Sequence, residues 1–398
     1  MDEIELSVQQ HTPQTTEVLT ALLKQFETQA HVRVKLRVFD WLSARAELDR
    51  VGLRGQGPDV SEIGSTWVTE LIAMNALRSF TASELAKIGR PQDFAAASWK
   101  TVHIEGDDTI RAIPWHAETY VIHYRKDLLW QAGVDEATAF ESHAQIDQTA
   151  ARLKTIGVPV PVELPLSSDH YGTLHALASW VWGRGGDFCS PNGKRVLFDR
   201  FEALSAIRAY FGLLRHLSPE GRQWMQTKEG AALFHQGKSA IAFGTIMLAQ
   251  SASALAPEVS ANWGTAALPA PCFVGGSNLV IWQHTRHERA AVELVRFLMS
   301  EAVLAQANRA MATLPPLTAM LDSAEFIPDP MRNVMAQAIK TGRSYPAFRL
   351  WGILEDRLVN TLLSIGVEVL AHPDRDLADL IDQQIIPLAQ RLSLTLAQ

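Results

Sequence analysis

The chain has 398 residues, of which 47% are hydrophobic and 20% are charged, and its 36 basic and 43 acidic side chains give a formal net charge of -7. This composition is typical of a folded protein, and the length predicts about two or three domains that each bury a core. Phosphate-binding surfaces usually carry a basic stripe, which this sequence lacks, so we expect no nucleic-acid partner.

Strand and helix patterns alternate along the first quarter of the chain. The predicted elements are a strand at 4–8, a helix at 16–29, a strand at 32–39, a helix at 43–52, a short strand after Gly57-Pro58-Asp59, and a helix at 68–74. These successive strand–helix units predict a parallel sheet with right-handed crossovers.

The pattern changes near Ile110, where two strand-like segments, 110–115 and 120–124, precede a helix at 126–132. Residues 144–222 are mostly helical in pattern, with breaks at the proline-rich segment 158–161 and the glycine-rich segment 183–187. Segment 234–244 predicts a helix end, a turn and a buried strand, and strands are predicted again around 263–269 and 275–281, followed by helices at 288–299 and 303–310.

Early and late strands therefore flank a helical middle, which indicates an α/β fold with two lobes. We expect an N-terminal lobe of residues 1–112 and 263–314, and a C-terminal lobe of residues 113–262 and 315–398.

The sequence predicts no membrane-spanning helix, since no window of about 18 residues is both apolar and uncharged. The start, Met1-Asp2-Glu3, has neither the basic nor the apolar region of a signal peptide. Cys189 and Cys272 form either one disulfide or two buried thiols. Without C-x-x-C spacing, a structural zinc site is not expected.

Known sequence motifs of hydrolases, zinc peptidases, P-loops and dinucleotide sites are absent, so we expect no enzyme activity and no cofactor. His116, His123 and His170 with Glu118 and Asp169 would form a metal-ligand set. They include no i, i+4 histidine pair on a clear helix, so surface or hydrogen-bonded histidines are the preferred interpretation and no metal is expected.

Tryptophan is the more informative residue type, with eleven in the chain. Four of them are predicted at strand ends or loops, where an exposed ring can cover the apolar face of a sugar: Trp67, Trp115, Trp182 and Trp351. The hydroxyl groups of a sugar need polar partners, and those available nearby are Gln10, Asp40, Glu118, Asn278 and Arg343. Core packing is the alternative for any single tryptophan.

Several motifs occur in a recognisable order: segments 57–60, 64–68, 113–119, 124–129, 234–244 and 275–279, then Tyr345-Pro346 before Trp351. Together they resemble bacterial extracellular solute-binding proteins of sugar ABC importers, in the maltose- and oligosaccharide-binding group. The resemblance implies two α/β lobes joined by a hinge, with a cleft that closes on a sugar without chemistry. It also implies importer membrane subunits as partners, a monomeric state, and a periplasmic or extracellular location, with the signal peptide already removed and a membrane tether as an option.

The same resemblance implies which residues line the cleft, because strand carboxyl ends and helix N-termini face the ligand in such folds. The implied positions are Gln10, His11, Asp40, Trp41, Ser65, Thr66, Trp67, Trp115, His116, Glu118, Trp182, Asp187, Gly244, Thr245, Gly276, Ser277, Asn278, Arg343 and Trp351. Two positions depart from the family pattern. Thr245 follows Gly244 where an aromatic is common, and Glu118 stands where many members have aspartate.

Two other functions stay open from the sequence. A carbohydrate-active enzyme would use Glu118 with Asp187 or Asp40 as acid and base. A receptor for a phosphosugar, a polyamine or a peptide would use the same scaffold, with Arg343 suited to phosphate and carboxylates suited to amines.

Overall fold

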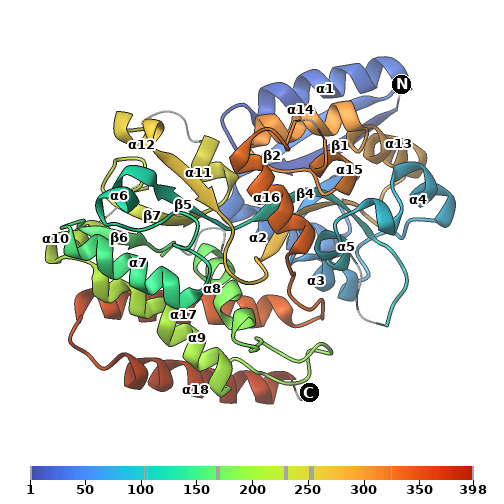
Figure 1. Ribbon diagram of the computed structural model, residues 1–398. Coiled ribbons are helices and arrows are strands. Elements are labelled where there is room, and N and C mark those ends of the chain that lie inside the picture. Colours follow the sequence, from blue (N-terminus) through green and yellow to red (C-terminus); the bar gives the residue numbers. More distant parts are fainter. Residues whose placement is uncertain are drawn as a thin grey trace. The chain divides into compact units, whose positions relative to one another are not determined.

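The structure is a computed structural model that describes residues 2–396 except 103, 105, 167–170, 228–231, 251–254 and 324. The chain divides into two compact units, each made of three segments (Figure 1). Unit 1 comprises Met1–Glu118, Val274–Pro328 and Arg343–Gly352, and unit 2 comprises Thr119–Phe273, Asp329–Gly342 and Ile353–Gln398.

These units differ from the expected lobes in four segments. Residues 113–118, 315–328 and 343–352 belong to unit 1, and residues 263–273 belong to unit 2. Strand pairing accounts for two of these differences, 113–118 and 263–273: β4 (Ala112–Thr119) lies beside β9 (Val274–Ile281), whereas β8 (Trp263–Ala266) pairs with β5 (Val121–Arg125).

Unit 1 is built on a five-stranded sheet in the order β2-β1-β3-β9-β4. As the sequence predicted, β1 (Glu3–Gln9) pairs in parallel with both β2 (Arg33–Phe39) and β3 (Val60–Gly64). β9 runs antiparallel to β3, with Gly64 opposite Ser277. The carboxyl ends of β1, β2 and β3 and the amino end of β9 therefore lie at one edge of the sheet.

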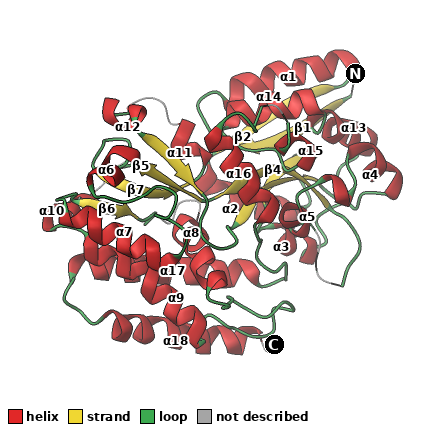
Figure 2. Ribbon diagram, in the orientation of Figure 1, coloured by secondary structure: helices red, strands yellow, loops and turns green. Residues whose placement is uncertain are grey.

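Helices cover both faces of this sheet (Figure 2). They are α1 (Thr15–Ala30), α2 (Trp41–Arg54), α3 (Val68–Ala73), α4 (Ala82–Ile88), α5 (Ala96–Lys100), α13 (Glu288–Leu298), α14 (Glu301–Met311) and α15 (Thr318–Leu321), with a 3-10 turn at Pro91–Asp93. α1 buries Leu19, Leu22, Leu23 and Phe26 at helical spacing and packs against α13 and α14. α2 and α3 supply Leu48 and other side chains to a second buried cluster.

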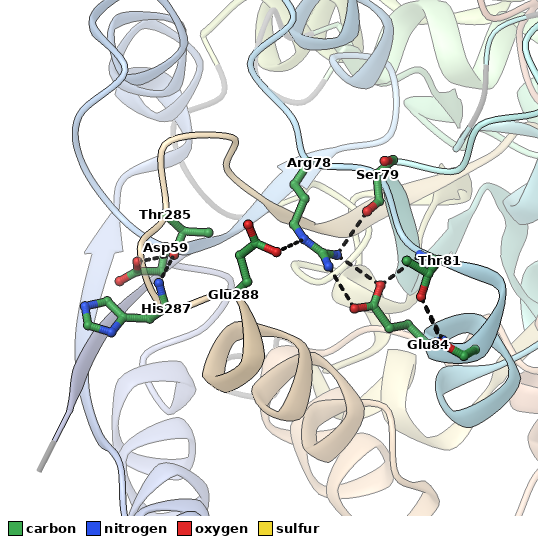
Figure 3. Close-up of polar contacts among 9 residues, drawn as sticks. Asp59, Arg78, Ser79, Thr81, Glu84, Thr285, His287 and Glu288 are labelled. Carbon is green, nitrogen blue, oxygen red and sulfur yellow. Dashed lines mark hydrogen bonds and ion pairs between the residues drawn. The ribbon is translucent and has the colours of Figure 1, made fainter.

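The Gly57-Pro58-Asp59 motif has a structural role in unit 1 (Figure 3). One carboxylate oxygen of Asp59 accepts from the backbone N–H of Glu5 at 2.8 Å, and the other accepts from the hydroxyl of Thr285 at 2.5 Å. Asp59 thus joins the first strand to the loop after β9.

A second polar group in the same figure is centred on Arg78. Its guanidinium makes a bidentate pair with Glu84 of α4, at 2.8 and 3.0 Å, and donates to Glu288 of α13 at 3.1 Å. Glu84 also closes the capping box of α4 with Thr81. Segments about 200 residues apart in the chain are held together here by one side chain.

Unit 2 contains a four-stranded sheet in the order β6-β7-β5-β8. β7 (Ser239–Gly244) is parallel to β6 (Val160–Glu163) and antiparallel to β5. The remaining elements are α6 (Lys126–Gln131), α7 (His143–Thr155), α8 (Gly172–Gly183), α9 (Phe201–Gly212), a 3-10 segment at Leu213–His216, α10 (Pro219–Thr227), α11 (Ile246–Gln250), α12 (Pro257–Ala261), α16 (Pro330–Thr341), α17 (Trp351–Ala371), whose first two residues belong to unit 1, and α18 (Leu377–Leu396).

Cys189 and Cys272 are both buried and are not joined by a disulfide, so of the two alternatives the buried thiols are confirmed. Within the described residues, every helix is too short or too polar to span a bilayer.

Candidate functional site

Side chains from four strands of unit 1 meet at the edge where β1, β2 and β3 end. His11 follows β1, Trp41 follows β2, Glu62 lies in β3, and His116 lies in β4. His116 joins the group because β9 packs closely on β4. If Gly276 of β9 carried a Cβ atom, that atom would lie 2.1 Å from the carbonyl oxygen of His116, and Gly276 has a φ of +117°. Only glycine fits this position.

Glu62 is the centre of the group and is fully buried. One carboxylate oxygen lies 2.7 Å from Nε2 of His11 and accepts from the hydroxyl of Ser277 at 2.6 Å. The other oxygen accepts from the backbone N–H of Gln9 at 2.9 Å. A buried carboxylate is costly unless its oxygens are paired, and here three donors pair them.

The electrostatics of the group follow from these contacts. Burial alone would raise the pKa of the Glu62 carboxyl. The electrostatic attraction and hydrogen bond of His11, with smaller contributions from His116 and Ser277, lower the pKa by more, so it lies below its usual value. Burial lowers the pKa of His116 to about 3. At neutral pH the site therefore holds an ionised carboxylate and a neutral His116 imidazole.

Aromatic rings surround this polar centre. The His11 ring meets Trp41 edge to face with centroids 5.2 Å apart, and Trp41 meets Trp67 in the same way at 5.8 Å. Trp41 is half-buried, whereas Trp67 is 7% exposed and belongs to the core beneath α2 and α3. Trp41 is therefore the more exposed ring of this pair.

Three members of the group are of a type that ligates metals. One ring nitrogen each of His11 and His116 and one oxygen of Glu62 lie within 4.8 Å of one another. The sequence predicted no metal site, and the ligand set that was considered and set aside there is a different one: His123 lies in unit 2 and accepts from the indole N–H of Trp263, while Asp169 and His170 lie outside the described residues.

The structure brings many of the expected site residues of unit 1 to this edge. Those that are partly or fully exposed there are Gln10, His11, Asp40, Trp41, Ser65, Thr66, Glu118 and Gly276. Asp40 also has a structural role, since its side chain accepts from the N–H of Leu42 and caps α2. The hydroxyl of Ser277 is committed to Glu62.

The expected exposure of four tryptophans is wrong. Trp115 lies inside β4 and is fully buried in the core beneath α1, α13 and α14. Trp351 is 2% exposed and stacks on Tyr345 with ring centroids 4.4 Å apart. Trp67 and Trp182 are buried too, each 7% exposed. Large aromatic side chains supply much of the apolar area that a core needs, and strand ends contribute to cores as well as to sites.

Other expected residues have partners of their own. The amide of Asn278 is buried against the hydroxyl of Thr101. The backbone carbonyl of Arg343 accepts from Val274. In unit 2, Asp187 accepts from the indole N–H of Trp182 at 3.3 Å and from the backbone N–H of Phe188.

Two further expected residues lie at the end of β7 in unit 2: Gly244 is its last residue, and Thr245 follows it. Gly244 is buried and lies opposite Val121, and the hydroxyl of Thr245 accepts from the N–H of Met247. The expected location of Trp115, His116 and Glu118 in the second lobe is corrected, because all three belong to unit 1.

Sequence reasoning missed Glu62. It lies within a strand in which all five positions are buried. A glutamate in such a run is a readable signal, because a charge in a fully buried strand needs dedicated partners. The partners themselves, His11, Ser277 and Gln9, come from other strands and are fixed only by the sheet order.

Comparison with known proteins decides the family. The model of the bacterial extracellular solute-binding proteins matches residues 21–333. The chain belongs to the bacterial extracellular solute-binding protein family. The diacetylchitobiose binding protein DasA of Streptomyces coelicolor is 24% identical over 345 residues, which cover 84% of this chain and 78% of DasA.

Solved structures of other solute-binding proteins share the fold. The sugar-binding protein MalE of Xanthomonas citri has a TM-score of 0.81 at 21% identity, covering 99% of this chain and 97% of that one. A solute-binding protein of Thermotoga lettingae bound with α-D-tagatose has a TM-score of 0.78 at 16% identity and covers 100% of both chains. The resemblance seen in the sequence and the expected two-lobed α/β fold class are therefore confirmed.

Proposed function

We propose that this solute-binding protein is a receptor for a neutral sugar or oligosaccharide and delivers it to an ABC importer without chemical change. The observation that carries the proposal is the half-buried Trp41 ring beside His11 and the ionised Glu62, at the edge where the parallel strands end. In open α/β sheets this edge is where ligands bind. DasA and the MalE protein, which are similar in sequence or fold, are named for sugar binding.

The chemistry of this edge suits a sugar. An indole face covers the apolar C–H face of a pyranose, and the polar side chains around it exchange hydrogen bonds with the ring hydroxyls. The side chains that we assign to this role are Gln10, His11, Ser65, Thr66 and Glu118. Glu62 acts through His11, because its carboxylate holds one ring nitrogen and so orients the imidazole.

The structure offers less support for an enzyme. Asp40 is engaged as a helix cap, and Asp187 already accepts from Trp182 and Phe188. A glycosidase needs two carboxyl groups held about 5 to 10 Å apart at the scissile bond, free to move protons. We therefore expect sugars to be recovered unchanged after incubation, and chromatography of the recovered sugar tests this.

A ligand screen is the direct test of the receptor function. Thermal shift against mono-, di- and oligosaccharides, sugar phosphates and polyamines finds the class, because a ligand that binds only the folded state raises the melting temperature. Calorimetry then gives the affinity. A rise with neutral sugars supports the proposal, whereas a rise only with sugar phosphates or polyamines contradicts it.

A tryptophan variant locates the site. Trp41→Ala should weaken sugar binding by about 1 to 3 kcal/mol through lost stacking and buried area. The matched control is Trp130→Ala in α6, whose side chain is 81% exposed and which lies in unit 2. Equal affinity of the wild type and Trp41→Ala would place the sugar elsewhere.

Family membership implies a periplasmic or extracellular location, and we propose importer membrane subunits as the partner and a monomer as the working form. Size-exclusion chromatography with light scattering checks the monomer. Sugar-dependent stimulation of ATP hydrolysis by a reconstituted sugar ABC importer checks delivery.

A further inference from the structure

We propose that His11, Glu62 and His116 bind one divalent transition-metal ion in unit 1. Two imidazoles and a carboxylate are a common ligand set for Zn²⁺ and its neighbours in the first transition row. The sequence did not predict the site, because its ligands come from the end of β1, from β3 and from β4 rather than from one helix. The inference does not require sugar binding, although His11 and Glu62 also belong to the proposed sugar site.

The hydrogen bonds of His116 fix which of its nitrogens is available. The amide nitrogen of Asn308 donates to the carbonyl of Leu304 at 2.9 Å, so the amide oxygen faces the imidazole. That oxygen lies 2.8 Å from Nδ1 of His116 and also accepts from the hydroxyl of Thr313 at 2.6 Å. Nδ1 therefore carries the proton and Nε2 carries the lone pair.

Nε2 of His116 is a buried nitrogen for which the described residues supply no hydrogen-bond partner. The residue is only 2% exposed, and an unsatisfied acceptor at that depth is costly. Metal-ligating histidines characteristically donate their other ring N–H to an oxygen, as His116 does to Asn308. The side chain is thus prepared as a neutral ligand.

Glu62 is prepared in the same manner. Ser277 and the backbone of Gln9 hold its two oxygens, and these are the contacts that orient a ligating carboxylate. Nε2 of His11 lies 2.7 Å from Oε1 of Glu62, the same oxygen that accepts from the hydroxyl of Ser277. His11 is thus placed to supply the second ligating nitrogen. A metal ion entering here would replace the proton between them, which leaves to solvent.

The spacing of the three groups fits a small ion. Ligand atoms about 2.0 to 2.2 Å from a tetrahedral ion lie roughly 3.4 Å from one another. One ring nitrogen each of His11 and His116 and one oxygen of Glu62 lie within 4.8 Å of one another, and the contact of His11 with Glu62 is 2.7 Å, so side-chain adjustments of about 1 Å complete the geometry. Three protein ligands leave one position of a tetrahedral ion for a water molecule or another small ligand.

The test uses the full chain without a histidine tag, first stripped with a chelator. Calorimetry with Zn²⁺, Ni²⁺ and Co²⁺ should show a single ion per chain, and Mg²⁺ and Ca²⁺, which prefer oxygen ligands, should not bind. Bound Co²⁺ should also give visible absorption bands that report nitrogen and oxygen ligands. Absence of saturable binding by all three transition metals overturns the proposal.

Two variants assign the ion to this site. His116→Asn keeps a donor toward Asn308 but removes the ligating nitrogen, and His11→Asn removes the partly exposed ligand. Each should weaken Zn²⁺ binding at least about tenfold. The control His123→Asn changes an equally buried histidine of unit 2 and should bind as the wild type does.

Circular dichroism confirms that each variant is folded before titration. Wild-type affinity in both cluster variants overturns the proposal, since the ion would then occupy surface histidines. Sugar and metal titrations of the wild-type protein separate the two proposals, because His11 takes part in both. Sugar binding without metal binding rejects only the metal site, and metal binding without sugar binding rejects only the receptor function.

Discussion

Trp351 shows how one residue can be a site candidate by sequence and a core residue by structure. Its ring is 2% exposed, stacks on Tyr345 and meets Phe348 edge to face. Trp351→Ala should therefore lower the free energy of unfolding by about 3 to 5 kcal/mol, the usual cost of truncating a buried aromatic. Urea denaturation followed by circular dichroism measures it.

Trp130→Ala is the control, because its exposed ring makes truncation nearly neutral, within about 0.5 kcal/mol. Sugar affinity of the folded Trp351→Ala protein should equal that of the wild type. If the variant melts like the wild type but loses affinity, the ring belongs to the ligand site after all.

At the scale of elements, the Arg78 contacts tie the loop before α4 to α13 of unit 1 (Figure 3). Both Arg78 and Glu84 are mostly buried, with side chains 15% and 19% exposed, so water screens the pair less than a surface pair. Arg78→Ala should lower the free energy of unfolding by roughly 1 to 2 kcal/mol.

Arg296→Ala is matched to it, since Arg296 pairs with Glu293 within one helix and is 52% exposed. An exposed pair of this kind contributes about 0.5 kcal/mol or less. Thermal melts of the two variants side by side make the comparison. Equal losses of stability in the two variants would show that the Arg78 contacts between α4 and α13 stabilise the fold no more than an exposed pair within one helix does.

The break expected at residues 158–161 is present, because α7 ends at Thr155 and α8 begins at Gly172. The sequence did not predict that Val160–Glu163 form the strand β6 within this break. Pro161 does not prevent this, because β6 is the edge strand of its sheet and one side needs no donor. By contrast, the sequence predicts β2 and α1 correctly. In β2 apolar residues alternate with polar ones, and in α1 they recur at helical spacing, so each element is defined by its own local pattern.

For the whole molecule, the order of strands could be inferred only in part. The parallel opening of unit 1 follows from short crossovers, but the insertion of β9 between β3 and β4 depends on pairing across about 200 residues. The residues of the site could likewise be predicted only in part. His11 and Trp41 are predictable as residues after parallel strands, whereas the partnership of Glu62 with Ser277 requires β9 to lie beside β3.

Buried neutral histidines in both units make the stability of the molecule depend on pH. Burial, with repulsion from His235, lowers the pKa of His123 to about 4, despite hydrogen bonds that favour its charged form, and burial lowers that of His116 to about 3. In the unfolded chain both titrate near the ordinary value of about 6.5. Between pH 6.5 and 4 the unfolded state therefore binds more protons, and the free energy of unfolding decreases as the pH falls.

Each of these histidines contributes a slope approaching about 1.4 kcal/mol per pH unit in that window, so His123 alone accounts for roughly 3 kcal/mol by pH 4. His123→Asn keeps an acceptor for the indole of Trp263 but does not titrate. It should therefore reduce the slope of the unfolding free energy against pH by up to about 1.4 kcal/mol per pH unit. Urea denaturation at pH 7, 6 and 5 measures the slope. His372→Asn, at an exposed position, is the control and should keep the wild-type slope. If His123→Asn keeps it as well, the imidazole takes up its proton in the folded state, and its burial does not hold it neutral.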